Sequence, residues 1–76
     1  MTKITKDMII GDLLREDQEM AGVLMGMGMH CIGCPASQME SIEEAAIVHG
    51  FEPDEFVTTV NDYVTKMQMV AEANNA

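Results

Sequence analysis

Apolar residues recur at helical spacing along most of this chain, and nowhere do apolar and polar residues alternate for long enough to build a β-sheet. The chain has 76 residues, enough for one domain. A domain this short buries only about 60% of the surface that its unfolded chain exposes, so its core is thin and its chemistry is expected near the surface. The sequence therefore predicts an all-α fold, a small single-domain bundle of about four helices over residues 1–76. Its core is expected over about residues 3–67, and residues 72–76 are expected to be a frayed tail.

The first two expected helices have weak boundaries. One is expected to begin at Thr5 or Asp7, and Gly11 weakens its first turns. A brief extended piece at Met8-Ile9 is the alternative for this segment. The second has apolar residues at positions i, i+3, i+4 and i+7 from Met20 to Met27, which is one face of an amphipathic helix. Gly26 and Gly28 flank its end, and a glycine there is able to take the left-handed conformation that ends a helix.

The last two expected helices have clearer signals. Ser41 and Glu44 have the spacing of a capping box, in which each side chain satisfies a free backbone N–H of the other residue. Gly50 ends that helix. Pro53 suits the first turn of the last and longest helix, because proline has no N–H to leave unpaired there. The cysteines then lie in the connection before the third main helix.

The chain is strongly acidic, with thirteen Asp and Glu against four Lys and Arg and a formal net charge of −9. Such a surface repels nucleic-acid backbones and anionic membranes, so neither is an expected partner. The most apolar window, residues 20–29, is too short to span a bilayer, and the N-terminal residues do not form a secretory signal. We therefore expect a cytoplasmic protein, in which a close cysteine pair is more often catalytic, redox-sensing or metal-binding than structural.

Chemically capable groups come together in one stretch, Gly28-Met29-His30-Cys31-Ile32-Gly33-Cys34-Pro35. Two residues between the cysteines place both sulfurs on one side of a tight turn or a first helical turn, close enough to bond. If a helix starts at Pro35, its free N–H groups favour the reactive thiolate, as does a protonated His30. The acidic surface opposes this effect, so we expect a modestly activated dithiol. By analogy with thioredoxin, Cys31 is the attacking sulfur and Cys34 the resolving one.

The same cysteines allow a second interpretation, a metal carrier. Met29, Cys31 and Cys34 fit the M-x-C-x-x-C loop of copper chaperones, where two thiolates hold Cu(I). Those loops follow a β-strand, which this sequence does not predict. Zinc and iron–sulfur sites usually need four ligands, which a homodimer is able to pool from two cysteine pairs. A third interpretation is a helical protein-interaction domain without chemistry.

The remaining candidate residues have structural interpretations. His49 is expected to pack, or to cap the C-terminus of the third main helix. Four methionines are expected in or near the core, because flexible thioethers fill irregular gaps; they are Met20, Met25, Met27 and Met29. Whether the protein is an enzyme, and whether it is a monomer or a homodimer, is left open by the sequence.

Longer motifs extend on both sides of the cysteines. In chain order they are Ile4-Thr5-Lys6-Asp7-Met8, Leu13-Leu14, the stretch Gly28 to Pro35, Ser41-Ile42-Glu43-Glu44-Ala45-Ala46, His49-Gly50 and Asn61. Together they resemble the hybrid-cluster-protein-associated redox disulfide domain, a small all-helical bacterial and archaeal family. The resemblance runs from about Lys3 to Val64.

This resemblance implies that Cys31 and Cys34 form a reversible disulfide, with His30, Gly33 and Pro35 as supporting residues. It also implies a link to proteins of iron–sulfur or nitrogen-oxide chemistry, such as the hybrid cluster protein. The leading hypothesis is thus a thiol–disulfide redox module that cycles Cys31 and Cys34 with a protein partner and needs no cofactor.

Overall fold

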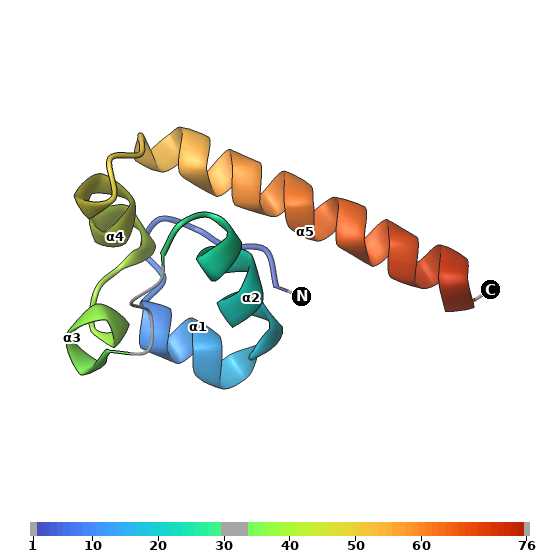
Figure 1. The fold of residues 1–76 in the computed structure, drawn as a ribbon, viewed down its shortest axis with the longest axis horizontal. Helices are drawn as coiled ribbons and strands as arrows, with labels where there is room; N and C mark the ends of the chain where they lie inside the picture. The colour runs from blue at the N-terminus through green and yellow to red at the C-terminus, as the bar shows by residue number, and fades with distance from the viewer. Residues whose placement is uncertain (1, 30–33, 76) are drawn as a thin grey trace.

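The computed structural model describes residues 2–29 and 34–75, and most of them are helical. Along the described chain run α1 (Ile10–Glu16), α2 (Glu19–Gly26), α3 (Pro35–Gln38), α4 (Ile42–Val48) and α5 (Pro53–Asn75). Figure 1 shows the four shorter helices gathered around one half of α5, whose other half projects away from them. The all-α prediction is confirmed for these residues, in which β-type pairing is limited to one isolated bridge between Ile9 and Ser41.

The described residues form five helices where the sequence predicts about four, and the additional one is α3. It has only four residues, fewer than the periodic pattern needs to become visible in a sequence. Pro35 stands at its first position, as expected for a proline that starts a helix.

The first helix begins at Ile10 and not at Thr5 or Asp7, so that prediction is wrong. The backbone before Ile10 is bonded to α4 instead. The Ile42 N–H donates to the Met8 carbonyl at 2.8 Å, and the Glu43 N–H donates to the Lys6 carbonyl at 3.0 Å. Both N–H groups lie in the first turn of α4, where a helix has no internal acceptors for them. The N-terminal segment, residues 2–9, therefore completes the start of a helix more than thirty residues away in the sequence.

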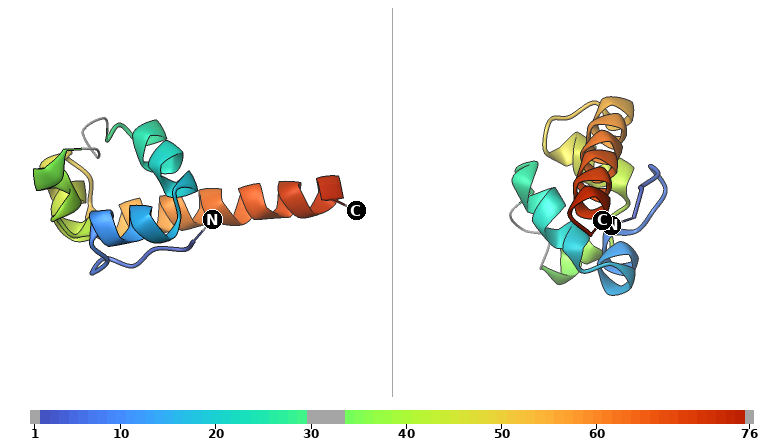
Figure 2. Two further views of the ribbon diagram at one scale, coloured as in Figure 1. Left: turned by 90° about the horizontal axis from the view of Figure 1, so that it is seen from below. Right: turned by 90° about the vertical axis from the view of Figure 1, so that its right-hand side faces the viewer.

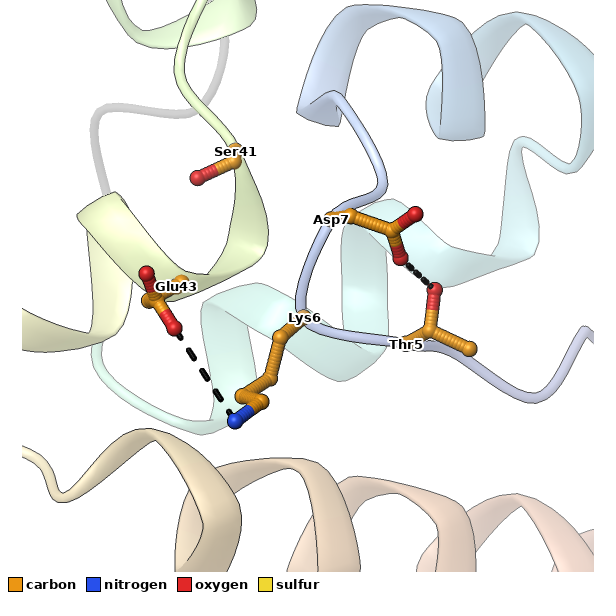
Figure 3. A pocket seen from close by; sticks show the side chains of 5 residues that line it. All are labelled: Thr5, Lys6, Asp7, Ser41 and Glu43. Carbon is orange, nitrogen blue, oxygen red and sulfur yellow. Dashed lines mark hydrogen bonds and ion pairs between the residues drawn. The ribbon is translucent and has the colours of Figure 1, made fainter.

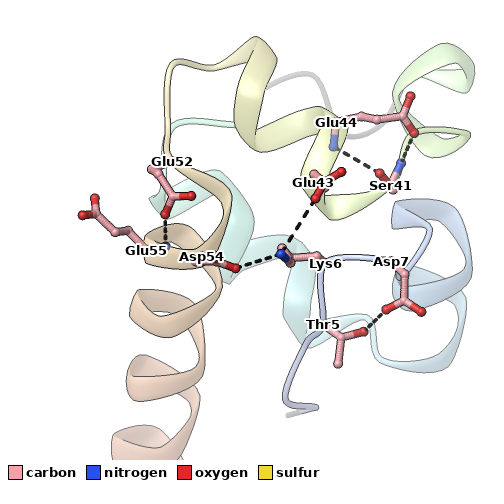
Figure 4. A network of polar contacts seen from close by, with 9 residues as sticks. All are labelled: Thr5, Lys6, Asp7, Ser41, Glu43, Glu44, Glu52, Asp54 and Glu55. Atoms are coloured by element: carbon pink, nitrogen blue, oxygen red, sulfur yellow. Dashed lines mark hydrogen bonds and ion pairs between the residues drawn. The ribbon is translucent and has the colours of Figure 1, made fainter.

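The ends of α4 follow the predicted signals. Ser41 and Glu44 form the capping box, each side chain bonding the other residue's backbone N–H at 3.1 Å (Figure 4). At the other end, Gly50 has φ +82°. The amides of Gly50 and Phe51 bond back to carbonyls of the last turn at 3.0 and 2.8 Å, the pattern of a Schellman motif. Local sequence thus predicts where this helix begins and ends.

A single hydrophobic core joins the N-terminal segment to α1, α2, α4 and α5. Its side chains are aliphatic or thioether apart from one phenylalanine, and they expose at most 8% of their surface. They are Ile4, Ile10, Leu13, Met20, Val23, Leu24, Met29, Ile42, Ala45, Ala46, Phe56, Val60 and Val64. Partly buried Phe51 tilts against Phe56, with 5.2 Å between ring centroids.

The N-terminal segment, which bonds to α4, is also bonded to Asn61 of α5. Its Nδ2 donates to the Ile4 carbonyl at 2.9 Å, and its Oδ1 accepts from the Ile4 N–H at 2.7 Å. The side-chain amide therefore imitates a neighbouring strand, pairing both backbone groups of one residue. This contact positions the Ile4 side chain in the core, where it exposes only 2% of its surface.

The apolar face of α5 extends beyond the core. Phe56, Val60 and Val64 are buried, whereas Met67 and Val70 on the following turns are 38% and 53% exposed. The left view of Figure 2 shows this half of the helix free of the other helices. The backbone of α5 is helical to Asn75, and fraying of residues 72–76 stays a prediction, as does the single-domain boundary. Among the described residues, no helix combines the length and the apolar composition that crossing a bilayer requires.

Gly11 makes a close approach between α1 and α3. It is buried, and a Cβ built on it would lie 2.8 Å from the Gln38 carbonyl oxygen and 3.1 Å from the Gln38 Cβ. No side-chain rotation relieves the first contact, because the carbonyl belongs to the backbone. The glycine that weakens α1 in the sequence therefore allows α3 to pack on it.

We expect Gly11→Ala to destabilise the protein although it improves helix propensity. Overpacking against fixed backbone costs about 1–3 kcal/mol, whereas the gain in helix propensity is about 1 kcal/mol. Gly22→Ala in α2 is the matched control, because a Cβ there meets nothing within 4 Å, and it should stabilise the protein. Urea unfolding measures both changes. An equal stabilisation by the two substitutions would contradict the packing role of Gly11.

We expect Asn61→Ala to lower the free energy of unfolding by about 1–3 kcal/mol, because it leaves two part-buried backbone groups of Ile4 without partners. Asp62→Ala, at the exposed neighbouring position, is the control and should change stability little. Hydrogen exchange at the Ile4 amide should accelerate only in the Asn61 variant. Unchanged exchange there would show that the segment is held without Asn61.

Candidate functional site

The structure describes some of the predicted site residues and not others. Met29, Cys34 and Pro35 lie in the described part of the chain. His30, Cys31 and Gly33 lie outside the described residues, so their predicted roles stay predictions. The structure therefore defines how the chain enters and leaves the candidate site.

On the entry side, α2 ends in a second Schellman motif. Gly28 has φ +98°, its N–H donates to the Met25 carbonyl at 3.0 Å, and the Met29 N–H donates to the Leu24 carbonyl at 3.1 Å. Of the two glycines predicted at this end, Gly28 takes the left-handed conformation, whereas Gly26 is the last residue of α2. The turn directs Met29 inward, where its side chain is fully buried in the core. The chain is thus anchored immediately before His30.

On the exit side, Cys34 is the N-cap residue of α3 and its side chain is exposed. Its backbone is extended, with φ −74° and ψ 139°, and its carbonyl accepts the Gln38 N–H at 3.1 Å. Gln38 in turn packs on Gly11 of α1. The thiol therefore stands at the surface on a helix that is itself seated on the core.

The described position of Cys34 limits how far away the second cysteine lies. Cys31 is three residues before Cys34, so the chain allows at most about 11 Å between their Cα atoms. A disulfide needs a Cα separation of roughly 4.4–6.8 Å, which a turn supplies. An exposed thiol with a second cysteine within this reach is capable of disulfide exchange or of binding a soft metal ion.

The structural interpretations of the other candidates are mostly confirmed. His49 is the C-cap residue of α4, and its Nδ1 lies 2.8 Å from the Ala45 carbonyl oxygen. Met20 and Met29 are fully buried and Met27 packs partly buried against the core, whereas Met25 is 47% exposed. The core placement is therefore wrong for Met25, which faces outward near the end of α2.

A hollow of about 560 Å³ lies elsewhere on the described surface. Thr5, Lys6, Asp7, Ser41 and Glu43 line it (Figure 3). Its polar groups are already paired. Thr5 donates to Asp7, and Ser41 caps α4. We interpret this hollow as part of the structural contact between the N-terminal segment and α4, because no predicted site residue lines it.

Lys6 is a structural residue that the sequence alone does not reveal. Its Nζ lies 3.0 Å from Asp54 of α5 and 4.0 Å from Glu43 of α4 (Figure 4). The hydrogen bond to Asp54 and the charge of that carboxylate raise the pKa of Lys6 above its ordinary value. Both acidic residues lie in first helical turns, where negative charge is favourable. The only hint in the sequence is that Lys6 is one of four cationic residues in a very acidic chain.

No metal site is complete among the side chains that the structure describes. Within residues 2–29 and 34–71, no three side chains of His, Cys, Asp or Glu gather closely enough to hold a metal ion. A metal site through Cys34 needs ligands from residues 30–33 or from a second molecule.

The fold and site define a class, a small helical domain that presents a cysteine at the start of a short helix seated on its core. The chain belongs to the family described as a domain of unknown function, DUF1858, whose model matches residues 4–57. It is similar to a protein from Clostridium thermocellum with an NMR solution structure, at 48% sequence identity and a TM-score of 0.65. The match covers 91% of this chain and 99% of that one. No curated protein matches the chain significantly.

We expect Gly28→Ala to lower stability by about 1–2 kcal/mol, the cost of forcing an L-residue into left-handed conformation. Because a Cβ at Gly28 meets nothing within 4 Å, no steric clash contributes. Gly28→Asn should cost less, since asparagine tolerates this region better. Gly26→Ala, inside α2 with equally open space, should be neutral or stabilising. Thermal unfolding ranks the stabilities of the three variants. Equal losses of stability from alanine at positions 26 and 28 would contradict the Schellman motif.

Proposed function

We propose that the protein is a thiol–disulfide redox module, in which Cys31 and Cys34 cycle between dithiol and disulfide by exchange with a protein partner. The observation that carries the proposal is the exposed Cys34 at the N-cap of α3, with a second cysteine three residues earlier. Exchange requires a sulfur that an incoming thiolate is able to reach, and a buried thiol is inert.

The anchors on either side support this use. Met29 is buried and α3 is seated on α1 through Gly11, so opening or closing a disulfide does not require the core to move. A redox pair that cycles needs both states to be compatible with one fold. The described residues on both sides of the cysteine stretch support this requirement, because they are held by contacts outside it.

The proposed reaction balances without a cofactor. A partner thiolate attacks one sulfur of the Cys31–Cys34 disulfide, forms a mixed disulfide and releases the other sulfur as a thiolate. The second partner thiolate then attacks the mixed disulfide and releases the remaining sulfur. The partner is oxidised by two electrons to its own disulfide, this chain is reduced to the dithiol, and the released thiolates take up protons lost by the partner. The reverse sequence oxidises the chain.

A narrower proposal concerns the setting of this reaction. The resemblance of the Gly28 to Pro35 stretch to hybrid-cluster-associated domains supports a partner in iron–sulfur or nitrogen-oxide chemistry. This link is supported by sequence resemblance alone.

A metal carrier that uses the same cysteines is the second candidate, and the exposed Cys34 favours it equally. Cu(I) binding through Met29 as well is less favourable, because the fully buried thioether would have to leave the core. Metal analysis of protein purified without a chelator separates the two functions. One bound metal ion per chain or per dimer, lost in a Cys31→Ser, Cys34→Ser double variant, would support the carrier.

We expect the purified protein to titrate as one two-electron couple in glutathione or dithiothreitol redox buffers. Its midpoint should lie between about −270 mV and −120 mV, the range from thioredoxin to strongly oxidising C-x-x-C proteins. Intact mass and free-thiol counting on untreated, oxidised and reduced protein measure the two states. In the oxidised form both thiols should be blocked and the mass should be lower by two hydrogen atoms.

Single variants are the control for this titration. Cys31→Ser and Cys34→Ser should each abolish the intramolecular couple and leave one reactive thiol, while the helical circular dichroism stays unchanged. The proposal fails if the wild-type pair cannot be oxidised by oxidised glutathione or reduced by thioredoxin.

A further inference from the structure

A protein that exchanges disulfides with this chain has to cover the surface around Cys34. In the mixed disulfide, two sulfurs lie about 2.05 Å apart. The partner residues next to its cysteine are then pressed against whatever surrounds Cys34. This holds whether the partner attacks Cys31 or Cys34, because the two sulfurs are bonded to each other in the oxidised form.

The described surface next to Cys34 is the outward side of α3. Pro35 and Ala36 are exposed, and Met39, the C-cap residue, is 80% exposed. Ala36 and Met39 are three residues apart and Pro35 and Met39 are four apart, so they share one side of the helix. Gln38 is turned inward toward α1 and half-buried. Helical side chains lean toward the N-terminus of their helix, so Met39 extends from the same side of α3 in the direction of Cys34.

This surface belongs to a long uncharged stretch of the chain. Residues 20–39 contain no Asp, Glu, Lys or Arg, so all thirteen acidic and four basic residues lie outside it. The nearest charges in the sequence are Glu19 and Glu40. A protein with a net charge of −9 thus has a neutral stretch around its cysteines. Recognition by α3 itself then depends on apolar contact and not on ion pairs.

We propose that the partner is a protein dithiol with an uncharged, apolar surface beside its cysteines, and that it docks on Cys34, Pro35, Ala36 and Met39. Met39 is the anchor of this contact, since it is the largest apolar side chain of the four and is almost fully exposed. Its flexible thioether adapts to partner surfaces of different shape. This inference rests on the proposed redox function and names the kind of surface that function requires.

The test measures reduction of the oxidised protein by thioredoxin, a protein dithiol, and separately by dithiothreitol, which is too small to need a docking surface. In both reactions two electrons pass from the reductant dithiol to the disulfide. Met39→Glu should slow reduction by thioredoxin about tenfold or more, as expected for loss of an interface anchor. It should leave the rate with dithiothreitol unchanged, and Met39→Leu should retain the wild-type rate with thioredoxin.

Ile47→Glu is the matched control. Ile47 is 59% exposed on α4 and outside the uncharged stretch, and its substitution changes the net charge by the same amount. It should react with thioredoxin at the wild-type rate. Thermal unfolding of both glutamate variants verifies that each is folded.

Three outcomes would overturn this inference and leave the proposed function standing. The first is that thioredoxin reduces the Met39→Glu and Ile47→Glu variants at equal rates, and the second is that Met39→Glu slows reduction by dithiothreitol as much as reduction by thioredoxin. The third is a wild-type dimer that Met39→Glu converts to monomer in gel filtration. The last would identify the face as a contact between copies of this chain. A wild-type protein that forms no disulfide, seen by thiol counting before any reductant is added, overturns the proposed function and this inference with it.

Discussion

The hydrogen bonds of the N-terminal segment are the contacts on which the rest of the fold depends. Its carbonyls at Lys6 and Met8 accept the unpaired N–H groups of the first turn of α4, and Asn61 of α5 pairs both backbone groups of Ile4. Lys6 adds ion pairs to both helices. One non-helical segment thereby joins helices far from it in the sequence. A chain of this length has few apolar contacts to spare, so such backbone pairing has unusual weight in its stability.

Two glycines decide how the cysteine stretch is held. Gly28 turns the chain so that Met29 enters the core, and Gly11 allows α3 to approach α1. Their roles are physically different. The first depends on a backbone conformation that other residues adopt at a cost, whereas the second depends on the missing Cβ. Both act outside the pair Cys31 and Cys34, so the proposed chemistry is positioned by residues that take no part in it.

Charged residues and the cysteine stretch lie in different parts of the chain. Acidic side chains begin α4 and α5, where they favour the helix dipole and pair with Lys6. The stretch from Met20 to Met39 has no charge, and its exposed methionines, Met25 and Met39, lie before and after the cysteines. The net charge therefore favours solubility without occupying the surface that a redox partner is proposed to contact.

The sequence by itself determined the features that depend on neighbouring residues. These are the capping box at Ser41, the glycine stops at Gly28 and Gly50, and the start of α5 at Pro53, because each of these signals is complete within one helical turn. The all-α class follows from the helical spacing of apolar residues along most of the chain. The sequence also singled out the cysteine pair, through spacing and resemblance. Only the tertiary structure decided that residues 2–9 form no helix and bond to α4 and α5, that α3 forms, that Gly11 is a packing residue and that Met25 and Met39 face outward. Each of these depends on contacts between residues distant in the chain, and a local pattern carries no information about such contacts.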